Sequence, residues 1–90
     1  MQFEWNPRKA GENLSRHGVS FHEAATVFDD SLAITYPDPD HSEDESRYLT
    51  FGVSADGRLL VIAHTEGRDT IRIISSRRAT RNERKIYEEG

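Results

Sequence analysis

The side chains best suited to proton transfer or anion binding lie in the last third of the chain. His64 can exchange a proton near neutral pH, because histidine is the side chain that ordinarily titrates there. Arg77 and Arg78 come just before a predicted helix start, where the positive end of the helix dipole adds to their charge. The arginine fork fits phosphate oxygens and keeps its charge. These two arginines are therefore the first candidates for binding phosphate, and a solvated basic strand end is the alternative.

Four more residues are candidates for chemistry. Arg72 is expected to contact either a phosphate or, as the alternative, a carboxylate of a partner protein. Tyr87 could donate a proton or stack on another ring, whereas a tyrosine in a terminal helix more often packs that helix onto a sheet. Lys9, whose alternative is a solvated surface position, and Arg47 are additional cationic candidates. For His64 the alternative is a structural histidine that is bonded to Glu66 or to groups near Arg47.

Charge is unevenly distributed along the chain. The formal net charge is −4, but residues 67–90 hold seven Arg or Lys against four Asp or Glu, whereas residues 1–66 hold five against twelve. Between positions 29 and 45 there are seven carboxylates and no Arg or Lys. Such a chain can present a basic face to an anion although it is acidic overall, and a solvated mixed surface is the alternative.

The composition excludes several classes of protein. Ninety residues make one small domain, 1–90, with a modest core. The absence of cysteine excludes disulfides, thiolate catalysis and cysteine-ligated metals. No apolar run approaches the ~18 residues of a membrane span, and the start of the chain lacks a signal-peptide pattern, so we expect a cytoplasmic protein. Asp38, Asp40 and Asp44 lack the glycine and the distant glutamate of a calcium loop, so we predict no metal site and no cofactor.

Capping residues predict two short helices in the first third of the chain. Asn6-Pro7 begins the first helix, and Gly18 ends it. Ser20 begins the second with a capping-box spacing to Glu23, and Asp29-Asp30 stops it. The remaining predicted elements outside the sheet's centre are short strands at 3–5 and 32–36, an acidic loop at 37–45 and a third helix that begins at Thr80.

Two turn signals predict a three-stranded antiparallel meander in the second half of the chain. Asp56-Gly57 is typical of a two-residue type I′ turn, and Gly67-Arg68 is typical of a type II′ turn. The predicted cross-strand pairs include Val53–Leu60, Phe51–Ile62, His64–Ile71 and Ile62–Ile73. The two registers together place seven apolar side chains on one face of the sheet and leave a mixed face opposite. These apolar residues are Leu49, Phe51, Val53, Leu60, Ile62, Ile71 and Ile73.

The elements together predict an α+β fold: a small antiparallel sheet, made of the meander and short N-terminal strands, packed with two N-terminal helices and one C-terminal helix. In this register His64 and Arg77 lie six residue pairs apart, roughly 20 Å at about 3.3 Å per residue, so they cannot both touch one phosphate. We expect a site centred on Arg77 and Arg78, or a separate cluster of Arg47, His64 and Glu66.

The sequence resembles the BrnT family of bacterial toxins over essentially the whole chain. The order of the motifs carries the resemblance more than any single motif does. The matching segments in the first half are Phe3-Glu4-Trp5-Asn6-Pro7, His17-Gly18-Val19-Ser20-Phe21 and Val27-Phe28-Asp29-Asp30. Those in the second half are Gly57-Arg58-Leu59-Leu60-Val61, His64-Thr65-Glu66, Ile71-Arg72-Ile73-Ile74-Ser75, Arg78-Ala79-Thr80 and Tyr87-Glu88.

The resemblance implies a RelE-like fold and a toxin of a type II toxin–antitoxin pair, which cleaves RNA and so inhibits translation. It also implies a partner, a BrnA-like ribbon-helix-helix antitoxin. Two toxins and two antitoxins would form a heterotetramer, and operator DNA would be bound only through the antitoxin.

Cleavage of RNA without a metal ion requires a base for the 2′-hydroxyl, cations beside the phosphate and an acid for the leaving oxygen. We therefore assign catalysis to His64, Arg77 and Tyr87, and RNA contacts to Lys9, Arg47, Arg72 and Arg78. The alternative function is a non-catalytic module whose mixed sheet face binds a partner protein. Growth arrest on expression without the partner, relieved by substituting Arg77 and Arg78, would distinguish the two.

Overall fold

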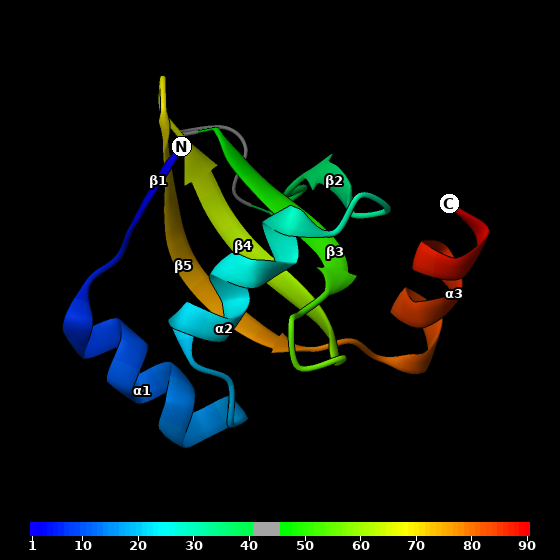
Figure 1. The fold of residues 1–90 in the computed structure, drawn as a ribbon, viewed down its shortest axis with the longest axis horizontal. Helices are drawn as coiled ribbons and strands as arrows, with labels where there is room; N and C mark the ends of the chain where they lie inside the picture. The colour runs from blue at the N-terminus through cyan, green and yellow to red at the C-terminus, as the bar shows by residue number, and fades with distance from the viewer. Residues whose placement is uncertain (41–45) are drawn as a thin grey trace.

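The computed structural model describes residues 1–40 and 46–90, which form a five-stranded sheet with helices packed on it (Figure 1). The elements are β1 (Gln2–Glu4), α1 (Pro7–His17), α2 (Phe21–Thr26), the 3-10 helix η1 (Val27–Asp29), β2 (Ile34–Pro37), β3 (Arg47–Val53), β4 (Leu59–Glu66), β5 (Thr70–Arg78) and α3 (Arg81–Glu89). The strand order is β1-β5-β4-β3-β2. The predicted α+β class is confirmed. The part of the acidic loop at 41–45, with Asp44, lies outside the described residues.

The predicted helix boundaries are confirmed by their caps. The Asn6 side chain accepts hydrogen bonds from the backbone N–H groups of Arg8 and Lys9, and Gly18 closes α1 in the left-handed conformation at φ 69°. Ser20 caps α2, and a complete capping box begins α3. In the described residues no helix has the length and apolar character needed to cross a bilayer.

The sheet is mixed, whereas the prediction was an antiparallel one. β1 runs parallel to β5, with Phe3 opposite Ile71, and the other neighbouring strands are antiparallel. The alternating pattern of residues 3–5 predicted a strand, but alternation carries no information about which edge of the sheet a distant strand will join.

The first hairpin differs from the predicted register by one residue. Ser54 donates its backbone N–H to the Arg58 carbonyl, so the loop has three residues and Gly57 occupies a left-handed position at φ 82°. Val53 therefore lies opposite Leu59, where the prediction placed it opposite Leu60. A three-residue loop that ends in a left-handed glycine is the common alternative to the type I′ turn, and Asp-Gly suits both.

The second hairpin also differs from its prediction. The turn residues are Arg68 and Asp69, and this turn pairs His64 with Ile73 rather than with Ile71. A bulge follows, because Ala63 pairs with Ser75 and the intervening residue of β5 is unpaired. Periodicity alone could not place the bulge, since one extra residue reverses the inward and outward positions beyond it.

The corrected registers divide the predicted apolar face in two. Leu60, Ile62, Ile71 and Ile73 point toward α1 and α2, on what we call the helical face, where they form the main core with Val19, Phe21, Ala24 and Val27. Leu49, Phe51 and Val53 point to the opposite side, which we call the open face. The sheet is thus apolar on both sides, and the prediction of one apolar face is wrong.

Helix α3 covers part of the open face. Near its start, Glu83 forms an ion pair with Arg77, and beyond its end Gly90 lies directly against the Ile34 side chain. Phe51 and Val61 lie between those two points, in the row of cross-strand partners that joins Ile34 to Arg77. Both are well buried, with Phe51 5% and Val61 3% exposed. The next row is less covered: Leu49 and Ala63 are half-buried and Tyr36 is exposed. The open face is therefore accessible along the row of Tyr36, Leu49 and Ala63 and beyond it, and we call this part the accessible half.

Candidate functional site

Three of the predicted cationic residues share the open face. The strand register places Arg47 opposite Thr65 and Thr65 opposite Arg72, so all three point to the same side. Arg77 lies on this face as well, because it pairs with Val61. Arg47 and Arg72 lie in the row next to that of Leu49 and Ala63. Arg77 lies on the other side of that row, near the start of α3. The fold thus places in one row Arg47 of β3 and Arg72 of β5, which are 25 residues apart in the sequence, and Arg77 lies two rows away on the same face.

Arg77 is held by a carboxylate of α3. Its Nη1 and Nη2 atoms donate to the two oxygens of Glu83 at 2.7 and 2.8 Å. The hydrogen bonds from Arg77 are the largest cause of the low pKa of Glu83, about 2, and the same carboxylate raises the pKa of Arg77. Arg72 is held more loosely, since its Nη1 lies 3.4 Å from an oxygen of Glu4 and both side chains are about half exposed.

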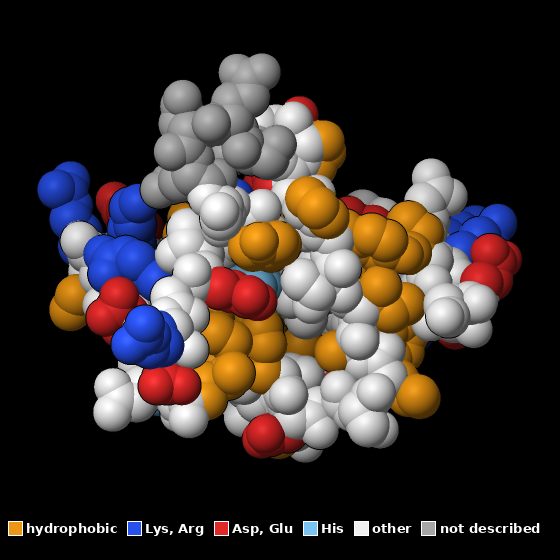
Figure 2. Space-filling view, turned by 90° about the horizontal axis from the view of Figure 1, so that it is seen from above, with side chains coloured by type: hydrophobic (Ala, Val, Ile, Leu, Met, Phe, Trp, Pro, Cys, Tyr) orange, Lys and Arg blue, Asp and Glu red, His pale blue; other side chains and the backbone are white. Residues whose placement is uncertain are grey.

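Figure 2 shows this mixing of charge on the surface. Lys and Arg side chains lie at the left and right ends of the view, in both places beside Asp or Glu side chains, while most of the exposed hydrophobic side chains lie between them. Basic character is therefore local in this molecule, as the uneven charge of the sequence predicts.

Tyr87 lies near the C-terminal end of α3 and fixes that end of the helix to Asp30, the residue that follows η1. Its hydroxyl donates to Asp30 Oδ2 at 2.6 Å, and the same oxygen accepts from the Val53 backbone N–H at 2.9 Å. The hydrogen bond to Asp30 raises the pKa of Tyr87 to about 12. Burial acts to raise the pKa of Asp30, but the hydrogen bonds from Tyr87, Val53 and Leu32 outweigh it and leave that pKa below its usual value.

His64 is a core residue on the helical face. Its side chain is 0% exposed, its Nε2 lies 2.7 Å from Thr50 Oγ1, and the ring packs edge-on against Phe28. Its Nδ1 has no hydrogen-bond partner and lies 3.9 Å from a Glu66 oxygen. Burial lowers the pKa of His64 to about 4, so the ring is neutral at pH 7. The catalytic role predicted for His64 stays untested, and the structure argues against it because a substrate cannot reach the ring.

The remaining two candidates lie away from the open face. Lys9 is exposed on α1, and Arg78 alternates with Arg77 along β5, so it points to the helical side. Arg77 and Arg78 therefore do not form one phosphate clamp, as their adjacency suggested. The predicted separation of His64 and Arg77 is also wrong: Arg77 pairs with Val61, three positions from His64, or about 10 Å at 3.3 Å per residue, and the two point to opposite faces.

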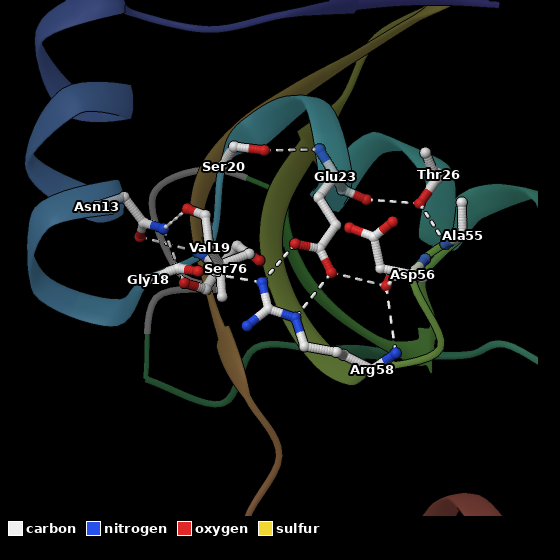
Figure 3. Close-up of polar contacts among 11 residues, drawn as sticks. Asn13, Gly18, Val19, Ser20, Glu23, Thr26, Ala55, Asp56, Arg58 and Ser76 are labelled. Carbon is white, nitrogen blue, oxygen red and sulfur yellow. Dashed lines mark hydrogen bonds and ion pairs between the residues drawn. The ribbon is translucent and has the colours of Figure 1, made fainter.

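A second polar cluster joins the hairpin β3–β4 to the helices (Figure 3). Glu23 was expected to complete a capping box, but its carboxylate instead accepts from Arg58 Nε at 2.9 Å and Ser54 Oγ at 2.7 Å. Arg58 also donates to the Gly18 carbonyl at 3.0 Å. The Arg58 hydrogen bond is the main cause of the lowered pKa of Glu23. Because these groups satisfy one another, the cluster fixes the hairpin to the helices.

Two residues near the candidate surfaces were missed by the sequence reasoning. Tyr36 is 43% exposed and its ring packs edge-on against Phe51 on the open face, where it is the exposed aromatic nearest the half-covered row. Asn13 is buried and hydrogen-bonds to both the N–H and the carbonyl of Ser76. A polar residue on the apolar stripe of the first helix was the available signal for Asn13. For Tyr36 only the correct register could have shown it.

The geometry can bind an anion but shows no metal cluster. Within residues 1–40 and 46–90, no three His, Asp or Glu side chains come together as metal ligands. The open face offers arginines beside an exposed aromatic ring, which is the combination that binds single-stranded nucleic acid through phosphates and bases.

Comparison with known proteins gives the family. The crystal structure of the ribonuclease toxin BrnT from Brucella abortus superposes with a TM-score of 0.71 at 19% sequence identity, over 90% of this chain and 99% of that one. That similarity shows the shared fold. No match is found among curated protein sequences. The family profile described as the ribonuclease toxin BrnT of type II toxin–antitoxin systems matches residues 5–83. The chain belongs to the BrnT family, the ribonuclease toxins of type II toxin–antitoxin systems.

Proposed function

We propose that this toxin cleaves RNA internally without a metal ion and binds it on the accessible half of the open face. The observation that carries the proposal is that Arg47, Arg72 and Arg77 point to one side of the sheet, in the two rows on either side of the row that ends at the exposed Tyr36 ring. Phosphates would lie against the guanidinium groups, and a base would stack on Tyr36.

The arginines can supply the positive charge that cleavage requires. In metal-free cleavage the 2′-oxygen attacks phosphorus as its proton passes to solvent water. The bond from phosphorus to the 5′-oxygen breaks as that oxygen takes a proton from an acid, which leaves a 2′,3′-cyclic phosphate. Negative charge builds up on the phosphate oxygens in the transition state, where Arg77 would stabilise it, while Arg72, two rows away on β5, would bind a neighbouring phosphate. We assign the acid to Tyr87, whose hydroxyl carries a proton at pH 7 and in the RNA-free protein donates it to Asp30. His64 becomes a structural residue in this proposal.

A toxin of a type II system has an antitoxin protein as its partner. We infer that the partner is a BrnA-like ribbon-helix-helix protein, that two copies of each chain assemble, that operator DNA is bound through the antitoxin alone, and that residues 1–90 act as one toxin domain in the cytoplasm. Co-expression followed by light scattering on a sizing column tests the assembly: a mass of two toxins plus two antitoxins is expected, and a one-to-one mass would contradict it.

Cleavage in the presence of EDTA tests the enzyme. Purified protein and labelled RNA should give discrete fragments with EDTA present. The Arg77→Gln variant should lower kcat by about 100-fold, the typical effect of removing one transition-state donor. The matched control is Arg84→Gln, which removes an exposed positive charge from α3, and this variant should cleave normally.

The outcomes distinguish the alternatives. Cleavage abolished by EDTA would overturn the metal-free mechanism. RNA bound but left intact, together with no growth arrest on expression, would favour the non-catalytic binding module. Tyr87→Phe should lower kcat at least about 100-fold if Tyr87 is the acid, whereas an unchanged kcat would leave Tyr87 with a packing role alone.

A further inference from the structure

A groove lies between α1 and β5, along the part of β5 that does not pair with β1. β1 pairs with β5 only as far as Arg72. Beyond that point the groove, about 170 Å³ in volume, is lined by Lys9, Glu12, Asn13, Arg16, His17, Ile74 and Ser75. Ile74 is the unpaired residue of the β-bulge, and such bulges commonly redirect side chains beside functional sites.

Asn13 fixes how α1 lies over this edge. Its amide accepts from the Ser76 N–H at 3.0 Å and donates to the Ser76 carbonyl at 2.8 Å, as a neighbouring strand would. Lys9 and Arg16 lie one turn before and one turn after Asn13, on the same side of the helix. The buried amide therefore holds two cationic side chains above the groove.

The cations at this groove are not neutralised within the described chain. Arg58, Arg72 and Arg77 each form an ion pair with a carboxylate. Across residues 1–40 and 46–90, by contrast, neither Lys9 nor Arg16 forms one. Two positive charges therefore face the groove with a single carboxylate, Glu12, among its lining residues.

Ser75 is common to the groove and the open face. Ser75 lines the groove, and its pairing with Ala63 also puts it in the half-exposed row of the open face. A strand of RNA lying on that face can therefore pass over Ser75 and reach the groove. Arg78 extends the same basic edge, because it lies two positions beyond Ser76 on the side that faces α1.

We propose that the α1–β5 groove is a second RNA subsite, in which Lys9 and Arg16 bind backbone phosphates outside the cleaved bond. The inference rests on the proposed function, since it assumes that the open face holds the scissile phosphate. These residues add affinity and fix the path of the strand. They do not touch the reacting atoms, so their loss raises KM and leaves kcat unchanged.

The test uses the full chain and a single-stranded RNA whose 2′-hydroxyls are methylated, so that binding is measured without cleavage. Each phosphate contact to a single strand adds about 0.7 to the slope of log affinity against log salt. The double variant Lys9→Gln/Arg16→Gln should lower that slope by about 1.4 and weaken binding about 15-fold at 150 mM salt, which is about fourfold for each contact. The control Arg84→Gln/Lys85→Gln removes the same charge from exposed positions of α3.

Equal weakening by the control, or an unchanged slope in the groove variant, overturns the subsite. The same two variants are then assayed for cleavage of unmodified RNA, where the groove variant should show a KM raised about 15-fold at an unchanged kcat. A reduced kcat would also overturn the proposal. Failure of the proposed function gives a different result, because the unsubstituted protein would then fail to cleave unmodified RNA in the presence of EDTA, whatever the two variants show.

Discussion

Acidification from pH 7 to pH 5 should destabilise the fold, because His64 is buried in its neutral form. Its side chain is 0% exposed, and burial lowers its pKa from the ordinary 6.5 to about 4. The unfolded chain therefore binds more protons than the folded chain between these values. Above about pH 6.5 His64 does not lower the free energy of unfolding. As the pH falls from about 6.5 toward about 4, protonation of His64 in the unfolded chain lowers that free energy.

The size of the effect follows from the two pKa values. Each pKa unit corresponds to about 1.4 kcal/mol, so the full difference is about 3 kcal/mol and the part lost between pH 7 and pH 5 is about 2 kcal/mol. The carboxylates with lowered pKa values, Glu23, Asp30 and Glu83, act in another window. Their contribution is present above their ordinary pKa values of 3.8 to 4.5 and is lost only below them.

Urea unfolding followed by far-UV circular dichroism at pH 7, 6 and 5 measures this loss. The midpoint should fall by about 1 to 2 M over the range, for an ordinary urea dependence of a small domain. In His64→Gln the stability should be lower overall but nearly constant with pH. If that variant does not fold, NMR titration of the imidazole in the unsubstituted protein replaces it. A stability that is flat between pH 7 and pH 5, or an imidazole that titrates near 6.5, would refute the reasoning.

Three further predictions concern stability and are each checked by urea unfolding. Asn13→Ala removes the partner of both backbone groups of Ser76 and of the Val19 carbonyl and should cost about 3 kcal/mol. Asn13→Asp, which sets a carboxylate oxygen against both carbonyls, should cost at least as much. Tyr87→Phe removes the hydrogen bond to Asp30 and should cost about 1 kcal/mol, with faster hydrogen exchange confined to α3; unchanged exchange there would contradict the role of this contact. Gly57→Ala should cost about 1 kcal/mol because φ is 82°, and a neutral effect would mean that the turn has another conformation.

Local signals in the sequence predicted the elements well. The caps at Asn6, Gly18, Ser20 and Thr80 each satisfy specific backbone groups next to them, so their effect is contained in a few neighbouring residues. For the same reason the two N-terminal helices and the C-terminal helix occur where the sequence places them.

The registers failed because they depend on information that is not local. Asp56-Gly57 fits a two-residue and a three-residue loop, and the choice between them moves Phe51 and Val53 to the other face. Helix α3 also buries part of the open face. Apolar residues therefore occur on both faces of the sheet and do not mark one side of it. The bulge beside Ile74 then reverses the alternation within β5.

The candidate site was predicted in part. Residue chemistry identified Arg47, Arg72 and Arg77 without showing that they share a face, and it grouped Arg77 with Arg78, which the strand separates. Glu83 was recognised as a capping residue, but its ion pair with Arg77 depends on how α3 folds back over the sheet. Family membership, in contrast, is carried by motifs along the whole chain, so it does not depend on the register.

The most direct test of RNA binding on the open face is an NMR titration of the protein with RNA that is methylated at its 2′-hydroxyls. Resonances of Tyr36, Leu49 and Ala63, which occupy the accessible half of that face, should shift or broaden in proportion to bound RNA. Saturable binding that leaves these three unchanged and perturbs α2 instead would contradict the central claim.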